Sequence, residues 1–152
     1  MPHQTVSPHR SLLGIDANLV ILVGYFGHLL VNQVDFLARL QWLVPVAIFV
    51  LEKRSRFVRF HAMQSFTLHL VGLAYALIMG GFFARLVVMP PTEWGALGGL
   101  AILGIVLALV LLAASVVAAI NGMQYKMYHL PLIGGLAARL TATLEGLIHR
   151  DG

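Results

Sequence analysis

The chain contains no cysteine and few charged residues. Of its 152 residues, 11% are charged and only six are acidic, whereas an average soluble protein carries about 25% charged residues. The absence of cysteine excludes a disulfide framework and zinc sites with thiolate ligands. A chain with so little charge lacks the polar surface that a globule or a disordered segment needs in water.

What the chain does contain is apolar sequence. Hydrophobic residues make up 59% of it, and its mean hydropathy is +0.88. Its length allows one domain. We therefore predict an all-α, polytopic membrane protein in which residues 1–152 form a single membrane domain.

Charge-free runs locate the membrane segments, because a charge at the bilayer centre is costly. Such runs cover residues 17–34, 60–84 and 94–125. A fourth segment is poorer, since it contains Arg39 and Pro45. We predict four transmembrane helices at about residues 14–33, 36–51, 62–86 and 95–120. The alternative for the first two segments is a re-entrant hairpin.

The distribution of basic residues predicts the orientation of the chain. With four crossings, one side carries Arg10, Lys53, Arg54, Arg56, Arg59, Lys126, Arg139 and Arg150, and the other carries only Arg39 and Arg85. We therefore expect a multi-pass protein of the cell inner (plasma) membrane with both termini in the cytoplasm.

The segment at about residues 124–149 differs from the predicted spans. Asn121 and Gly122 are residues that cap a helix C-terminus, so the fourth span is expected to end there. Leucines then recur at helical spacing from Leu136 onward. This pattern predicts a short amphipathic helix on the cytoplasmic membrane surface.

Small residues recur every fourth position in the third predicted span and again in the fourth. Close backbone approach at such positions holds membrane helices together. The candidate packing residues are Gly72, Ala76, Gly80, Gly95 and Gly99, with Gly24, Gly27, Ala114, Ala118 and Gly122 as further candidates. Helix wheel positions place His61, Gln64, Ser65 and His69 on the same side as the first stripe. Packing within the chain is one interpretation, and an oligomer or a partner subunit is the other.

The segment from Glu52 to His61 is the densest polar site. Its basic residues lie beside a span, where each attracts anionic headgroups by about 1 kcal/mol; setting the topology is the alternative role. Seven histidines suggest a metal or haem, and His28 and His69 are the candidate pair for haem. The sequence has no metal-ligand spacing among its histidines and no catalytic acid pair. We expect no metal, no cofactor, no nucleic-acid partner and no catalysis.

The run Ser-Arg-Phe-Val-Arg-Phe-His-Ala-Met-Gln-Ser over residues 55–65 resembles the signature of the Tic-twenty-like membrane family. That family includes a chloroplast inner-envelope translocon subunit, bacterial relatives and the magnetosome protein MamF. Weaker matches are Gly-His-Leu at 27–29, Leu-Val-Pro at 43–45, Ala-Ala-Ile at 118–120 and Tyr-His-Leu-Pro at 128–131. The matches cover about residues 25–136. Ser65 replaces the usual alanine, and a long transit region is absent.

The resemblance implies a four-helix membrane protein with both termini on one side and, in plastids, a part in preprotein import. We therefore expect a non-catalytic protein that binds a partner membrane protein, a second copy of itself, a translocating polypeptide or anionic lipid. The expected partner-binding and lipid-binding residues are Lys53, Arg54, Arg56, Phe57, Arg59, Phe60, His61 and Gln64. A pore or carrier lined by His61, Ser65 and His69 is the first alternative, and a haem or redox subunit is the second.

Overall fold

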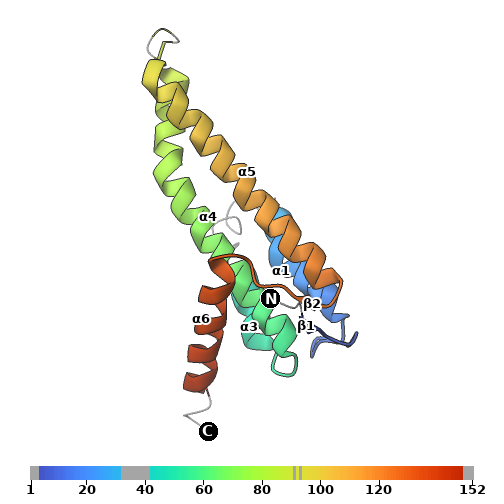
Figure 1. The fold of residues 1–152 in the computed structure, drawn as a ribbon. Helices are drawn as coiled ribbons and strands as arrows, with labels where there is room; N and C mark the ends of the chain where they lie inside the picture. Colours follow the sequence, from blue (N-terminus) through green and yellow to red (C-terminus); the bar gives the residue numbers. More distant parts are fainter. Residues whose placement is uncertain (1–3, 32–41, 91, 93, 149–152) are drawn as a thin grey trace.

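The computed structural model describes residues 4–31, 42–90, 92 and 94–148. Within these ranges the chain forms five helices and two very short strands, labelled as in Figure 1. The strands are β1 (Gln4–Thr5) and β2 (Lys126–Met127), and the helices are α1 (Ala17–Val31), α3 (Leu43–Leu51), α4 (Arg56–Val88), α5 (Gly95–Met123) and α6 (Ile133–Ile148). The predicted all-α class is confirmed for the described residues, apart from the small β1–β2 ladder.

Helices α4 and α5 form a long antiparallel hairpin that dominates the molecule (Figure 1). Both are long and apolar enough to cross a membrane: Arg56–Val88 has 33 residues, and Leu97–Met123 has 27. A helix of 33 residues is about 50 Å long, against about 30 Å of hydrocarbon. The third and fourth predicted spans therefore coincide with helices of sufficient length.

The first two predicted spans are described only in part. Helix α1 has 15 residues and α3 has nine, which correspond to about 22 Å and about 13 Å of helix. Residues 32–41, including Arg39, lie outside the described part of the chain. Neither α1 nor α3 as described meets the length for a span, so four crossings and the re-entrant alternative both stay predictions.

Helix α4 begins six residues before the predicted span. The Ser55 side chain caps it by accepting a hydrogen bond from the backbone N–H of Val58 at 3.2 Å. A serine in this position satisfies one of the donors that a helix N-terminus leaves without an intrahelical acceptor. The charge criterion missed this turn because it excludes Arg56 and Arg59 from a membrane span, although a helix can continue beyond the hydrocarbon.

Helix α5 continues through the predicted cap at Asn121-Gly122 and ends at Met123. The residue that takes the left-handed conformation is Tyr125, with φ of +55°. Gly122 is needed elsewhere: a Cβ atom there would lie 2.6 Å from Cγ2 of Ile21 on α1. The glycine therefore permits close approach of α1 and α5, and the predicted C-cap role is wrong.

The packed core lies around the end of the hairpin where α4 begins and α5 ends. Helices α1, α3 and α6 all contact α4 there, and α1 also contacts α5. Completely or almost completely buried core residues come from α1, α4, α5 and α6: Ala17, Ile21, Tyr25, Val58, Ala62, Ala118, Ala119 and Ala137. The opposite half of the hairpin lies outside this core, and Leu77, Ile78, Val87 and Val88 are exposed on it.

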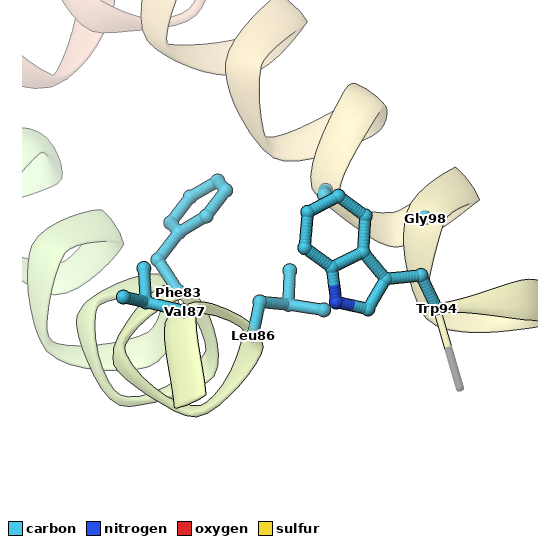
Figure 2. A pocket seen from close by; sticks show the side chains of 6 residues that line it. Phe83, Leu86, Val87, Trp94 and Gly98 are labelled. Atoms are coloured by element: carbon cyan, nitrogen blue, oxygen red, sulfur yellow. The ribbon is translucent and has the colours of Figure 1, made fainter. Parts of the chain in front are cut away.

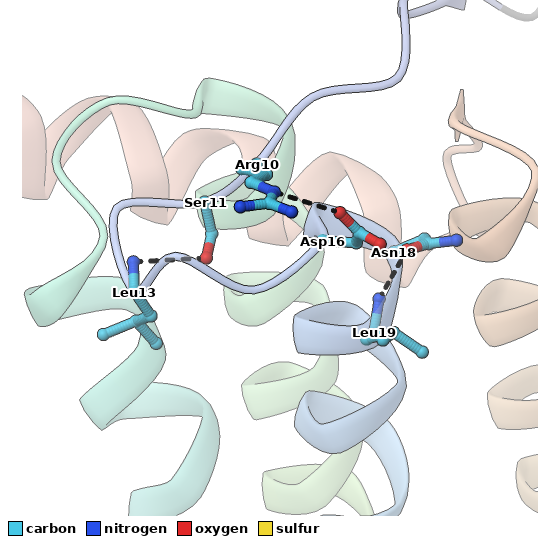
Figure 3. Close-up of polar contacts among 6 residues, drawn as sticks. All are labelled: Arg10, Ser11, Leu13, Asp16, Asn18 and Leu19. Atoms are coloured by element: carbon cyan, nitrogen blue, oxygen red, sulfur yellow. Dashed lines mark hydrogen bonds and ion pairs between the residues drawn. The ribbon is translucent and has the colours of Figure 1, made fainter.

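The N-terminal segment is bound to this end of the molecule. Strand β1 pairs antiparallel with β2, with Gln4 opposite Met127 and Thr5 opposite Lys126. Beyond it, the chain turns back on itself before α1. Figure 3 shows this turn, in which Arg10 approaches Asp16 at 3.8 Å and the N–H of Leu13 donates to the Ser11 hydroxyl at 3.2 Å. The segment from Gln4 to Asp16 is thus part of the fold.

The predicted interfacial segment divides into two parts. Residues 124–132 contain β2 and a turn, and only Ile133–Ile148 is helical. Helix α6 packs on α4 and buries Ala137 completely, while Leu136 and Leu140 remain exposed on it. The amphipathic helix is present, and one of its faces covers protein.

Candidate functional site

The eight residues predicted to bind partners or lipid do not form one surface. The structure separates them into exposed basic residues, a packed aromatic layer and a buried polar cluster. Lys53, Arg54 and Arg56 are exposed, Phe57 and Phe60 are buried, and His61 and Gln64 are completely buried. On α4, the side chains of one face are therefore buried in the protein, and those of another face are exposed.

The aromatic layer joins the start of α4 to the segment after α5. The Phe57 ring stacks on Tyr125 with centroids 5.8 Å apart, and it meets the His61 ring edge-on at 4.9 Å. The Phe60 ring lies 4.6 Å from the ring of His129. The Arg59 guanidinium lies 4.5 Å from the ring centroid of Phe49 on α3, a cation–π distance. Phe57 and Phe60 therefore hold α4 against the segment after α5, and Arg59 holds it against α3.

His61 connects three parts of the chain. Its Nε2 lies 3.1 Å from the carbonyl oxygen of Lys126, and its Nδ1 lies 3.3 Å from the hydroxyl of Tyr25. A carbonyl oxygen only accepts hydrogen bonds, so the proton is on Nε2, and Nδ1 accepts from Tyr25. His61 thereby links α4 to α1 and to β2.

Gln64 completes the buried polar cluster, which we define as Tyr25, His61 and Gln64. Its amide nitrogen donates to the Tyr25 hydroxyl at 3.0 Å, and its carbonyl oxygen accepts from the N–H of Leu130 at 3.3 Å. A buried amide needs such partners on both ends. Two predicted site residues, His61 and Gln64, are thus brought together by a tyrosine that the sequence did not single out.

Ser65 and His69 lie one and two helical turns beyond His61 on α4. The Ser65 hydroxyl donates to the carbonyl oxygen of Gly24 at 2.7 Å, and Nδ1 of His69 lies 2.8 Å from the carbonyl oxygen of Ser65. Ser65 is completely buried. The three residues of the pore hypothesis therefore all use polar atoms in contacts within the chain.

Replacing Ser65 with alanine tests the strength of its contact with Gly24. We expect Ser65→Ala to lower the free energy of unfolding by about 1 kcal/mol, because hydrogen bonds between membrane helices contribute about 0.6–2 kcal/mol. The measurement is denaturation of the detergent-solubilised chain followed by circular dichroism. Thr143→Ala is the control, since that hydroxyl donates at an exposed position to a carbonyl of its own helix. Equal losses in the two variants would contradict the assignment.

Glu52 connects the N-terminal segment to the start of α4, a role that the sequence analysis did not predict. It is completely buried, and its carboxylate accepts three backbone N–H bonds, from Leu12 at 2.7 Å and from Arg54 and Ser55 at 2.9 Å each. One buried side chain thus satisfies three backbone donors from two parts of the chain. The only signal in the sequence was a lone acid among basic residues.

The main predicted packing residues do not approach a neighbouring helix closely, whereas some of the further candidates do. A Cβ atom built on Gly72, Gly80, Gly95 or Gly99 meets nothing within 4 Å, and Ala76 is exposed. Packing within the chain therefore does not occur at these positions. Close approach occurs at two of the further predicted candidates, Gly27, opposite Val44 of α3, and Gly122, opposite Ile21 of α1. It also occurs at Gly104, which was not predicted, opposite Met79 and Phe83 of α4. The alternative of an oligomer or partner subunit stays open.

Two cavities lie at opposite ends of the hairpin. The first, of about 410 Å³, is lined by the end of α4 and the start of α5. Figure 2 shows Phe83, Leu86 and Val87 on one side of it and Trp94 and Gly98 on the other. Its lining is apolar, as expected for a hollow in a lipid-exposed part of a membrane protein.

The second cavity, of about 420 Å³, lies at the start of α4. It is lined by three arginines, Arg10, Arg54 and Arg56, together with residues that include His9, Ser55 and Phe57. We call it the arginine cavity. It includes three of the predicted partner-binding and lipid-binding residues, Arg54, Arg56 and Phe57, and brings to them Arg10 and His9 from the N-terminal segment. Lys53 does not line it.

The metal and haem hypotheses receive no support from the described residues. Among them, no three side chains of histidine, cysteine, aspartate or glutamate come together as a metal-binding group. The side chain of His28 lies outside the described part of the chain, so its predicted pairing with His69 is not described.

Comparison with known proteins gives one match. Residues 17–137 match the MamF/MmsF family, described as the magnetosome magnetite crystal formation protein family. No curated protein and no solved structure matches the chain. The match covers most of the chain and includes α1, α3, α4, α5 and β2, and the two long apolar helices agree with a membrane location. The chain therefore belongs to the MamF/MmsF family of integral membrane proteins.

Proposed function

We propose that the chain is a non-catalytic membrane subunit that binds other membrane components in the process named by its family description, the formation of magnetite crystals. The observation that carries this proposal is the contrast between its two ends. Polar side chains at one end are occupied by internal hydrogen bonds, whereas large apolar side chains at the other end are exposed.

The exposed half of the hairpin is the surface proposed for this association. Leu77, Ile78, Val87 and Val88 are each more than 70% exposed, and Gly80, which is also exposed, lies on the same half of α4. Lipid can cover such a surface, but exposed glycines in a membrane helix also allow another backbone to approach closely. We propose a second membrane helix, from a copy of this chain or from a partner subunit, as the component bound there.

The proposed orientation is multi-pass with both termini on the cytoplasmic side. Arg10, Arg54 and Arg56 line one cavity at the start of α4, and Arg85 lies 29 residues further along that helix, near its other end. Basic residues are retained on the cytoplasmic side of membrane proteins, which supports this orientation in an inner membrane.

A part in polypeptide transport or solute passage is supported less well. Either role needs a polar path, and neither of the two cavities described above is lined by His61, Ser65 or His69. The internal hydrogen bonds of these residues favour a structural role. The proposed binding of another membrane helix therefore explains more of the exposed residues and internal hydrogen bonds than transport does.

Complementation tests the proposed function. A magnetite-forming bacterium that lacks its own member of the family receives the wild-type chain or the variant Gly80→Leu, and crystal size is measured by electron microscopy. We expect the wild type to restore crystal size and Gly80→Leu to fail, because the leucine fits the isolated chain, where nothing lies within 4 Å, but obstructs a closely packed partner.

The control for this experiment is Leu77→Ile, which keeps an apolar side chain of the same size on the same helix. It should complement fully. Circular dichroism should show that Gly80→Leu remains folded. If the wild type reaches the membrane but does not restore crystal size, the proposed process is wrong; if Gly80→Leu also complements, the proposed surface is wrong.

A further inference from the structure

We propose that the arginine cavity binds a phosphate group, carried either by a phospholipid headgroup or by free phosphate. The cavity joins Arg10 of the N-terminal segment to Arg54 and Arg56 at the start of α4. This inference does not depend on the proposed association or on magnetite formation. It rests on the charge, position and construction of the cavity.

The charge of the cavity is strongly unbalanced. Its lining contains three guanidinium groups and no acidic side chain. Arg10 lies 3.8 Å from Asp16, but both side chains are more than half exposed, and such a pair contributes little. Among the described residues, neither Arg54 nor Arg56 has an acidic partner. A bound dianion would balance this positive charge.

Guanidinium groups suit phosphate in particular. Each presents a rigid fork of N–H donors that matches the oxygens of a phosphate group. The cavity volume of about 420 Å³ is within the range of about 300–1,000 Å³ typical of ligand sites. The cavity is thus large enough for a phosphate group together with the first atoms attached to it.

The cavity is built by several tethers that hold its walls in place. Nε2 of His9 lies 2.7 Å from the Ser55 hydroxyl, which also caps α4. The buried Glu52 carboxylate fixes the N–H groups of Arg54 and Ser55 on one side and that of Leu12 on the other. The N-terminal segment is therefore hydrogen-bonded to the start of α4 on both sides of Arg10. These contacts hold Arg10, Arg54 and Arg56 around the same cavity.

The position of the cavity suits a lipid headgroup. Arg56 is the first residue of α4, and the charge-free run begins at Phe60. The cavity therefore lies where the apolar part of the helix begins, at the depth of the headgroups. Val6, Phe57 and Met127 supply apolar lining beside the arginines, which is suited to the carbon atoms next to a lipid phosphate.

The test uses the full chain in neutral detergent and has two arms. In the first arm, inorganic phosphate is titrated and the thermal stabilisation of the chain is measured. In the second arm, retention of phosphatidic acid against phosphatidylcholine is measured by native mass spectrometry. We expect the double variant Arg54→Gln/Arg56→Gln to weaken binding at least tenfold, which corresponds to about 1.4 kcal/mol.

The matched control is Arg85→Gln/Arg139→Gln, which removes the same net charge from exposed positions outside the cavity. It should change the affinity less than twofold. Binding in the first arm identifies free phosphate as a sufficient ligand, and binding in the second arm alone identifies the lipid headgroup; both support the site. Unaltered thermal stability without ligand excludes misfolding of the double variant.

Two outcomes would overturn the proposal. One is the absence of selective binding in both arms. The other is an equal loss of affinity in Lys53→Gln and Arg56→Gln, because Lys53 belongs to the same basic segment but does not line the cavity. The second result would mean that general surface charge, rather than the cavity, attracts the anion.

Discussion

Glu52→Ala is expected to lower the free energy of unfolding by on the order of 4 kcal/mol. The substitution removes the acceptor of three backbone hydrogen bonds, from Leu12, Arg54 and Ser55. Each polar group left without a partner in a buried site costs about 1–3 kcal/mol. Part of this cost is avoided because Leu12 lies near the surface, where water can replace the carboxylate.

The effect should be localised at the N-terminal segment. Glu52 uses Oε2 for Leu12 and Oε1 for Arg54 and Ser55. Glu52→Gln keeps an acceptor on one side only, because its amide NH₂ group donates. If the amide oxygen stays with Arg54 and Ser55, the NH₂ group opposes the N–H of Leu12. We therefore expect a smaller loss of stability than for alanine, accompanied by faster proteolysis of residues 4–16.

Denaturant titration in detergent, followed by circular dichroism, measures the stability, and limited proteolysis with mass spectrometry locates the opened segment. Lys53→Ala is the control, since Lys53 is next to Glu52 in the sequence and its side chain is exposed. Surface substitutions usually change stability by less than about 0.5 kcal/mol. A loss for Glu52→Ala no larger than that of Lys53→Ala would contradict the role assigned to the carboxylate.

The helices of the hairpin were predictable because a membrane helix is specified by one local property. A charge-free run must be long enough to cross the hydrocarbon, and residues 60–84 and 94–125 satisfy that condition from the sequence alone. The ends of these helices were less predictable. The start of α4 involves the Ser55 hydroxyl as its cap, and the role of Gly122 is set by the proximity of Ile21, a hundred residues earlier in the chain.

The candidate site was predicted as one continuous stretch of sequence. In the structure, the direction in which each side chain points decides whether it is buried or exposed. Residues 53–64 include side chains that point into the core, such as His61, and others that line the arginine cavity, such as Arg56. Helical periodicity alone placed the glycines and the polar residues of α4 on one side. It could not show that neighbours cover only the first part of that side, because the lengths and positions of the other helices decide this.

The N-terminal segment was the part least accessible to sequence reasoning. Its strand has two residues, and its partner in β2 lies more than a hundred residues away. Such a short strand has no detectable period, and pairing at that separation is a property of the folded chain. Arg10 was counted only for its charge, although the fold brings it into a cavity with Arg54 and Arg56.

His61→Ala is the second substitution with a large expected effect, a loss of about 3 kcal/mol. It removes the hydrogen bonds to Tyr25 and Lys126 and leaves a cavity beside the rings of Phe57 and Phe60. Loss of a large buried side chain costs about 2–5 kcal/mol, and a buried carbonyl or hydroxyl left without its partner adds to that cost.

The same substitution should weaken the contact between three elements rather than one. His61 holds α4 against α1 through Tyr25 and against β2 through Lys126, so its loss should loosen the β1–β2 ladder as well. Hydrogen exchange of the Val6 amide, which donates to the carbonyl oxygen of Tyr125, is expected to accelerate together with that of α1. A loss of partner binding in His61→Ala would then follow from the damaged fold, whereas the same loss in a variant of the exposed half would not.

A double-mutant cycle separates the hydrogen bond from the packing. Tyr25→Phe removes the hydroxyl that links His61 and Gln64 but keeps the ring, and stabilities of the two single variants and the double variant give the coupling energy. Residues that share a hydrogen-bond network couple by about 0.5–3 kcal/mol. We expect about 1 kcal/mol for this pair. His129→Ala is the control, because that imidazole is exposed and contacts Phe60 rather than the polar cluster; its effect should add to that of Tyr25→Phe. If the effects of Tyr25→Phe and His61→Ala were also additive, the cluster would contribute to stability through packing alone.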